Sequence, residues 1–325
     1  MLKKNVNRKL ILFSLLAFSV ILSSCSSKSA AADAPGTAQT RDVFYYTFED
    51  DLGYKVELKE KPDRVAALTG SYGETWILAG GSLAGTTEDL SSERGIELPE
   101  GTRIVGTVKE PNLEEILSLS PDFILLSSAV ESHLYIHETL VKSGIPHGYF
   151  KVEQFEDYLR MLGICTDITG IKDLYRTNGT EVQEKIENVL SKAIVPLRPT
   201  VLFIRAYSSG ARAMDADNFT NKILQDLGTE NIAEKHQSLL AELSMEEIIE
   251  EDPDYIFVTT MGNTQKALEF MEKSIENNPA WGSLSAVKNG RYVVLPKDLF
   301  HYKPNARWGE SYEYMAKIIY PEVFR

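Results

Sequence analysis

Cysteine is nearly absent from this 325-residue sequence, which contains only Cys25 and Cys165. Cys25 directly follows an apolar N-terminal segment, so Cys165 is the one thiol left for the rest of the chain. A single cysteine cannot close an internal disulfide, and the folded protein must therefore be held together by packing.

Basic residues are also scarce, with 34 Lys and Arg against 47 Asp and Glu, which gives a net charge of −13. Four of the basic residues are Lys3, Lys4, Arg8 and Lys9, and their removal with a signal segment leaves 30 against 47, a net charge of −17. Nucleic-acid binding needs an excess of Lys and Arg near the phosphates, so this class of partner is excluded.

The signature motifs of several enzyme classes are missing. The chain has no Gly-x-Ser-x-Gly elbow, no phosphate-binding Gly-Lys-Ser/Thr loop and no Cys-x-x-Cys pair, and Gly80-Gly81 is not part of a dinucleotide fingerprint. We therefore predict that the protein is not an enzyme.

The apolar run Leu10–Leu22 is too short to span a bilayer but fits the core of a secretory signal. It ends in Leu-Ser-Ser-Cys25, which resembles the bacterial lipobox and implies cleavage before Cys25 and a lipid on its sulfur. The alternative is an ordinary signal peptide with an incidental cysteine. We predict a lipoprotein signal at 1–24 and a flexible tether, rich in Ser, Ala, Gly and Thr, at 25–42.

One pattern occurs twice at fixed spacing. Glu114-Glu115-Ile116 is followed after four residues by Pro121-Asp122-Phe123-Ile124, and Glu246-Glu247-Ile248 is followed in the same way by Pro253-Asp254-Tyr255-Ile256. Each copy predicts a short helix, a proline break and a buried strand. The repeat implies two lobes of similar fold, with a carboxylate pair at the same place on each lobe and a groove between them.

Strands that are apolar throughout alternate with helices, which favours parallel sheets covered on both faces. We predict an α/β fold of two lobes, 43–164 and 196–325, each with a central mostly parallel sheet flanked by helices. One long linker helix is predicted within 165–195, because apolar residues recur at helical spacing from Asp167 to Lys192. Gly179 costs that helix about 1 kcal/mol, too little to break it.

Several segments, taken in order and spacing, are similar to one known family. They are Pro62-Asp63-Arg64-Val65, Val105-Gly106, Asn112-Leu113-Glu114-Glu115-Ile116, Pro121-Asp122, Leu227-Gly228 with Asn231-Ile232-Ala233, Trp281 through Leu295, and His301-Tyr302-Lys303-Pro304-Asn305 to Tyr320-Pro321. Together they resemble the substrate-binding lipoproteins of ABC importers, in the helix-linked class III periplasmic-binding-protein family for iron siderophores, haem and cobalamin. The resemblance covers Tyr54 to Pro321.

The resemblance implies two contacts with a permease. In that family one glutamate on each lobe docks an arginine pocket of the permease, and the matching positions here are Glu114 and Glu246, with Glu115 and Glu247 as secondary candidates. Charge-assisted pairs to arginine would favour correct docking. The alternative is that these acids stabilise the dipoles of their helices, and the repeat alone does not separate the two roles.

Ligands of open parallel sheets gather beyond the carboxyl ends of the strands. That rule selects loops at 69–73, 127–135, 206–214, 259–263 and 299–303, and the third lies in a longer predicted loop, Ala206–Asp217. The ligand-binding candidates in or beside these loops are Tyr72, Tyr207 and Tyr302 for stacking, Arg205 and Arg212 for an anion, and Met261 and His301 for a metal centre in the ligand. For each of them the alternative is packing or an ion pair within its own lobe.

The histidines offer a second grouping. His133 and His137 are four residues apart, so a helix would place them on one face, where Glu138 could join them around zinc or manganese. The remaining histidines, His147, His236 and His301, form no evident second half of such a site. We therefore predict no metal site and no resident cofactor, the iron belonging to the ligand.

We expect a monomeric receptor that is lipid-anchored at the outer face of the cytoplasmic membrane. It is expected to capture an iron chelate in the inter-lobe cleft and deliver it to an ABC permease and its ATPase. A ferric siderophore is the first expectation, haem or cobalamin in the same role is the alternative, and a bare zinc or manganese ion is less favoured. A sensory or adhesive lipoprotein without a transporter is a competing class.

Overall fold

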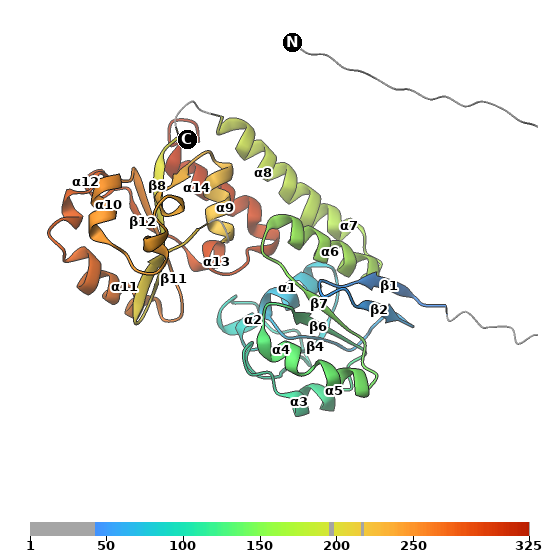
Figure 1. The fold of residues 1–325 in the computed structure, drawn as a ribbon. Coiled ribbons are helices and arrows are strands. Elements are labelled where there is room, and N and C mark those ends of the chain that lie inside the picture. Colours follow the sequence, from blue (N-terminus) through green and yellow to red (C-terminus); the bar gives the residue numbers. More distant parts are fainter. Residues whose placement is uncertain (1–42, 195–197, 216–217, 325) are drawn as a thin grey trace, which may run out of the picture. The chain divides into compact units, whose positions relative to one another are not determined.

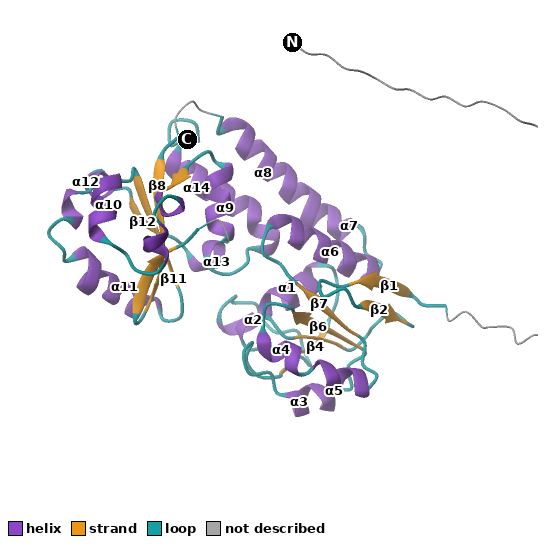
Figure 2. Cartoon of the chain, in the orientation of Figure 1, coloured by secondary structure: helices purple, strands orange, loops and turns teal. Residues whose placement is uncertain are grey.

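Two five-stranded sheets carry the fold, which the computed structural model describes for residues 43–194, 198–215 and 218–324 (Figures 1 and 2). The predicted signal, Cys25 and the whole of the predicted tether lie outside these residues. Within the described ranges, every helix is too short or too polar to cross a membrane. The prediction of an α/β fold with two mostly parallel sheets is confirmed.

The N-terminal sheet is parallel throughout, in the order β5-β4-β3-β6-β7. Its strands are β3 (Val65–Ala67), β4 (Leu83–Thr86), β5 (Arg103–Ile104), β6 (Phe123–Ser127) and β7 (His147–Phe150). The helices of this lobe are α1 (Gly70–Leu78), α2 (Asp89–Ser92), α3 (Leu113–Ser118), α4 (Glu131–Tyr135) and α5 (His137–Lys142). Every residue of β6 is buried, because helices cover both faces of the sheet. A separate antiparallel hairpin is formed by β1 (Tyr46–Glu49) and β2 (Lys55–Leu58).

The C-terminal sheet has the order β10-β8-β11-β12, all parallel, and β9 pairs with β8 in the antiparallel direction. Its strands are β8 (Thr200–Tyr207), β9 (Gly210–Ala213), β10 (Glu230–Asn231), β11 (Tyr255–Thr260) and β12 (Tyr292–Val294). The prediction of a plain loop from Ala206 to Asp217 is therefore wrong, because residues 206–213 continue β8 and turn back as a hairpin.

Helices of the C-terminal lobe are α9 (Phe219–Asp226), α10 (Met245–Glu251), α11 (Thr264–Met271), α12 (Ser285–Lys288), α13 (Lys297–Phe300) and α14 (Trp308–Ile319). Short 3₁₀ turns occupy Ile232–Glu234, Gln237–Leu240, Trp281–Ser283 and Asn305–Arg307, and a π turn follows α11 at Glu272–Glu276. Residues 43–325 form one compact unit, so the exact boundaries proposed for the two lobes stay predictions.

The segment between the sheets is helical but not one helix. It consists of α6 (Phe155–Thr169), α7 (Asp173–Tyr175), a π turn (Arg176–Thr180) and α8 (Glu181–Lys192). The single helix predicted from Asp167 is wrong at its start, because Gly170 adopts φ +78° and ends α6. Gly179 does not break the helical segment that follows Gly170. That segment widens into the π turn at Gly179 instead. A Cβ at Gly179 would lie 3.0 Å from the Leu159 side chain of α6, so glycine permits this close packing.

These linker helices pack against both sheets. One hydrophobic cluster contains Phe123 of β6, Leu162 of α6, Val189 of α8, Met315 of α14 and Phe203 of β8. All five side chains are nearly or completely buried. Bending the linker would expose this apolar surface, at about 25 cal/mol per Å², so the linker resists large changes of angle.

The two copies of the repeat form the same local structure. Asn112 caps α3 by accepting a hydrogen bond from the Glu115 N–H, and Ser244 caps α10 by accepting one from the Glu247 N–H. In both copies a strand buried along its whole length follows, β6 in the first and β11 in the second. The predicted helix, break and strand are therefore present in each lobe.

The Pro-Asp pair of each copy has a structural role. Asp122 accepts hydrogen bonds from the backbone N–H of Arg64, just before β3, and Asp254 accepts one from the N–H of Thr200, the first residue of β8. Each aspartate thus ties the start of its own strand to the start of the neighbouring parallel strand. This explains why the same dipeptide precedes a central strand in both lobes.

Candidate functional site

A small cavity of about 210 Å³ lies at the carboxyl edge of the N-terminal sheet. Thr69 and Tyr72, just beyond β3, and Ser127, at the end of β6, line it together with Lys303 from the C-terminal part of the chain. Pockets that enclose a drug-sized ligand usually measure about 300–1,000 Å³. A bulky ligand held here would therefore extend beyond the cavity.

The hairpin of β8 and β9 brings two arginines together. Arg205 and Arg212 are directly opposite each other in the antiparallel register, so their side chains emerge on the same face. Neither forms an ion pair with an acid in the described residues, and the Nε of Arg205 is buried without a hydrogen-bond partner there. Burial, and after it the charge of Arg212, lowers the pKa of Arg205. Two facing cations repel each other, so this arrangement favours an anion between them.

Two further nitrogen-bearing side chains lie close enough to interact with this pair. Burial lowers the pKa of Lys303 to about 8, Glu153 opposes this shift, and Arg205 adds to it. Burial lowers the pKa of His301 to about 4, with Arg205, Lys297 and Lys303 acting in the same direction. His301 is therefore neutral at pH 7, and its Nδ1 is buried with no hydrogen-bond partner in the described residues. The site combines fixed cations with one uncharged imidazole.

The predicted aromatic contacts fall into different environments. The hydroxyl of Tyr72 donates to the carbonyl of Phe150 at 2.8 Å, and burial raises the pKa of Tyr72 to about 12. Tyr72 thus lines the cavity, but its hydroxyl is already bonded to the backbone of the core. Tyr207 packs over Gly210, where a Cβ would lie 2.6 Å from its hydroxyl oxygen, so this tyrosine supports the hairpin turn.

The remaining predicted contacts lie nearer the solvent. Tyr302 is half-buried, and the Lys297 ammonium lies 5.2 Å from the centre of its ring. Met261, directly after β11, is 44% exposed. Both follow the carboxyl end of a C-terminal strand, β12 and β11 respectively, as the sequence predicted.

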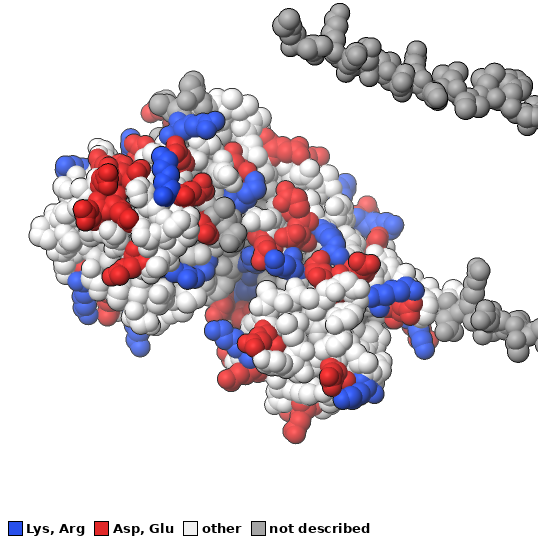
Figure 3. All heavy atoms as spheres, in the orientation of Figure 1, with Lys and Arg blue, Asp and Glu red and all other residues white. Residues whose placement is uncertain are grey.

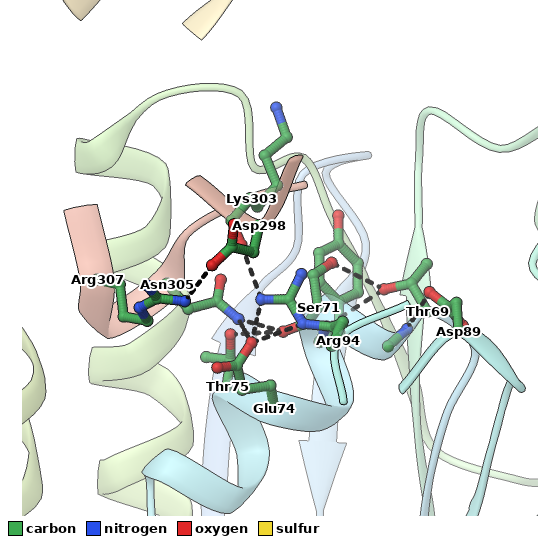
Figure 4. A network of polar contacts seen from close by, with 12 residues as sticks. Thr69, Ser71, Glu74, Thr75, Asp89, Arg94, Asp298, Lys303, Asn305 and Arg307 are labelled. Atoms are coloured by element: carbon green, nitrogen blue, oxygen red, sulfur yellow. Dashed lines mark hydrogen bonds and ion pairs between the residues drawn. The ribbon is translucent and has the colours of Figure 1, made fainter. Parts of the chain in front are cut away.

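A buried polar cluster that sequence reasoning missed joins the two lobes (Figure 4). Glu74 of α1 accepts a hydrogen bond from Arg94 at 2.6 Å and one from the Asn305 amide at 2.7 Å. Arg94 also donates to the carbonyl of Lys303 at 2.8 Å, and Asn305 donates to the carbonyl of Ser71 at 2.9 Å. No sequence pattern joins residues this far apart; Asn305 and Glu74 are separated by 231 positions.

The four acids of the repeat divide into two kinds. Glu114 and Glu246 are exposed and form no ion pair or hydrogen bond through their carboxylates in the described residues. By contrast, Glu115 pairs with Arg103, and Glu247 accepts a hydrogen bond from Ser238 at 2.6 Å. Acidic side chains gather over α10, whose sequence contains Glu246 (Figure 3). The two unpaired carboxylates are therefore available to a partner.

The grouping of His133, His137 and Glu138 around a metal is wrong. His133 is completely buried, its Nδ1 accepts a hydrogen bond from the Ser127 N–H, and its Nε2 contacts the Val108 carbonyl at 3.0 Å. Glu138 is exposed and pairs with Lys142 of the same helix. Across the described ranges, no group of three or more His, Cys, Asp or Glu side chains is arranged to hold a metal ion.

Comparison with known proteins identifies one family. A sequence model described as periplasmic binding protein matches residues 65–299. The chain is 24% identical over 324 residues to the Fe(3+)-citrate-binding protein YfmC of Bacillus subtilis, covering 98% of both chains. It is 24% identical over 300 residues to the iron-uptake system-binding protein of the same organism, covering 89% of this chain and 90% of that one.

Solved structures agree on the fold. The structure of Staphylococcus aureus SirA complexed with staphyloferrin B aligns with a TM-score of 0.64 at 22% identity, covering 85% of this chain and 98% of that one. At this level of identity the likeness concerns the fold, a two-lobed α/β architecture.

The contact between the lobes gives a testable expectation for stability. Substitution of Glu74→Gln leaves the mostly buried guanidinium of Arg94 without its counter-charge, so the free energy of unfolding should fall by about 3 kcal/mol. Chemical denaturation followed by circular dichroism measures this change. The matched control is Glu181→Gln, which breaks the exposed pair with Arg176 and should cost at most about 1 kcal/mol. Equal losses in the two variants would contradict the role given to Glu74.

Proposed function

Because the chain belongs to the periplasmic binding protein family, we propose that it is the extracytoplasmic receptor of an ABC importer and captures an anionic iron chelate. The ligand is proposed to bind at the carboxyl ends of the two sheets, over the cavity beside Tyr72 and against the arginine hairpin. The proposal gives the chain a role in transport and not in catalysis. It also includes a lipid on Cys25, a monomeric state and a location at the outer face of the cytoplasmic membrane.

The observation that carries the proposal is the pair Arg205 and Arg212. In a protein with a net charge of −13, these two cations face each other with no ion pair to an acid among the described residues. The Arg205 Nε is buried without a hydrogen-bond partner in the part of the chain that the structure describes, which costs free energy unless a ligand accepts its hydrogen bond. A carboxylate suits the planar fork of a guanidinium, and Lys303 adds a third cation nearby.

The iron content of the ligand rests on the relatives. One is named for binding Fe(3+)-citrate and another for iron uptake. A ferric complex of a polycarboxylate is anionic and bulky, which suits both the cationic hairpin and a cavity too small to enclose the whole ligand. We therefore place carboxylate-bearing ferric chelates first.

Haem is the second candidate, and His301 is the reason. Its Nδ1 is buried without a partner in the described part of the chain, and its low pKa keeps the ring neutral. A neutral imidazole is a common ligand of haem iron. No residue of the described site specifically favours cobalamin over these two.

The exposed carboxylates of Glu114 and Glu246 are proposed to dock the permease. Because each follows a capped helix start at the same point of its lobe, the two charges are held at a fixed separation. Two separated ion pairs set the orientation of a partner as well as attracting it. The ATPase of the importer would then use the docked complex to drive uptake.

Ligand binding can be tested by quenching of tryptophan fluorescence with ferric citrate, haemin and cyanocobalamin. We expect saturable binding of ferric citrate, weakened about 10- to 100-fold by Arg205→Gln, because one charge-assisted hydrogen bond is lost. Arg212→Gln should act in the same direction, whereas the exposed Lys59→Gln should change nothing. If haemin alone binds, and His301→Gln removes its absorption change, the haem assignment replaces the first one.

The pH dependence of affinity follows from Lys303. Its pKa of about 8 means that the ammonium loses its proton as the pH rises from 7 to 9. Affinity for an anionic chelate should therefore fall by about tenfold over this interval, since one charge-assisted contact disappears. Lys303→Gln should bind more weakly at pH 7 and show a flat profile, measured by the same titration. A wild-type affinity that rises with pH would refute the assignment.

Docking can be separated from capture. The double variant Glu114→Ala with Glu246→Ala should bind ligand with unchanged affinity but lose uptake of ⁵⁵Fe-labelled chelate by cells. The matched control is Glu110→Ala with Glu242→Ala, which removes two exposed acids from the same lobes and should transport normally. Normal uptake by the first double variant would rule out these docking residues.

A further inference from the structure

A groove of about 1240 Å³ lies on the opposite edge of the N-terminal sheet from the proposed ligand site. It is open to solvent and is lined by Pro62, Pro121 and Pro146, which precede β3, β6 and β7 respectively. The groove is therefore at the amino ends of the strands. Its chemistry is distinct from that of the carboxyl edge, because two histidines line it, His137 and His147.

These two imidazoles meet edge to face. His137 is the first residue of α5 and His147 the first residue of β7, and their rings cross at 76°. The Nδ1 of His137 lies 3.1 Å from the Nε2 of His147. Both residues are half-buried, and both line the groove.

Hydrogen bonds determine what faces the Nδ1 of His137. The Nδ1 of His147 lies 2.8 Å from the carbonyl of Ile145, which can only accept, so this nitrogen carries the proton and Nε2 presents a lone pair. The hydroxyl of Tyr149 donates to the carbonyl of His133 and is 3.3 Å from the same Nδ1 of His137. A lone pair on the Nε2 of His147 and one on the hydroxyl oxygen of Tyr149 thus both face the Nδ1 of His137, which therefore carries a proton.

We propose that His137 and His147 form a binding site for a divalent transition-metal ion of the Ni²⁺, Cu²⁺ or Zn²⁺ class, with water completing its coordination. Metal–imidazole bonds are about 2.0–2.1 Å long, so two nitrogens 3.1 Å apart subtend roughly 100° at the metal, close to tetrahedral or square geometry. The His137 ring stays neutral, since Nδ1 releases its proton to water as the metal binds and Nε2 takes one proton from water, with no net release.

Neighbouring groups hold both imidazoles in fixed orientations before any metal binds. The bond from His147 to the Ile145 carbonyl fixes its tautomer and orientation, as outer partners do for histidines that bind metals. Tyr54 stacks on His137 with ring centres 4.7 Å apart and holds that ring in place.

The site would act on the N-terminal lobe and not on the proposed ligand. It joins α5 to the edge strand β7, so an ion bound only by the folded chain would stabilise this lobe against unfolding. With two protein ligands and no carboxylate, it is a weaker site than a buried three-ligand centre. Iron chelates at the other edge of the sheet should bind independently of it.

Titration calorimetry of the full chain with Ni²⁺ tests the proposal. We expect one saturable equivalent in the wild type, its loss in both His137→Gln and His147→Gln, and its retention in the control His236→Gln. His236 is a suitable control because it is paired with Glu251 at 2.7 Å, away from the groove. Ni²⁺ should also raise the melting temperature of the wild type and of the control only. Retention of the equivalent in either groove variant overturns the proposal.

A second measurement does not depend on the variants. Electron paramagnetic resonance of the wild type with one equivalent of Cu²⁺ reports the atoms bound to the metal, and ¹⁵N-labelled histidine identifies imidazole nitrogens. Splitting from two histidine nitrogens supports the site. A spectrum of oxygen ligands alone, or of a single nitrogen, means that the pair is only a hydrogen bond and that the proposal is wrong.

Discussion

Parallel strand pairing is the constraint on which the rest of this structure depends, because it directs every strand of a sheet toward the same edge. In the N-terminal sheet all pairs are parallel, and in the C-terminal sheet only β9 runs in the opposite direction. The two edges of one sheet therefore differ in chemistry. Hydroxyl and aromatic groups such as Ser127 and Tyr72 gather at the carboxyl edge, whereas prolines and an imidazole pair gather at the amino edge.

The charge of the chain and the charge of the proposed ligand site have opposite signs. Acids outnumber bases overall, yet Arg205 and Arg212 face each other without a compensating carboxylate in the described residues. Arg94, by contrast, is neutralised by Glu74 inside the contact between the lobes. An arginine thus stabilises the fold where a buried acid lies beside it, and it remains available to bind an anionic ligand where no acid is present.

Local features were predictable because neighbouring residues create them. The repeat predicted a helix and a strand in each lobe, and the structure adds that Ser120 and Asp252, each just before the proline, both adopt positive φ, 48° and 39°. Two of the predictions that were wrong depended on contacts beyond the local segment. Residues 206–213 extend a strand because a hairpin partner is available, and His133 is buried because the Ser127 N–H needs an acceptor.

The sequence by itself determined the two-lobed α/β architecture, the linker's helical character and the edge of the sheets at which the proposed ligand site lies. These follow from hydrophobic periodicity, caps and the order of strands, which are properties of adjacent residues. Only the tertiary structure decided that Arg205 faces Arg212, that Glu74 meets Asn305, and that His137 contacts His147. Such contacts depend on which segments pair and on how the helices pack against the sheets, which the spacing of residues along the chain does not specify by itself.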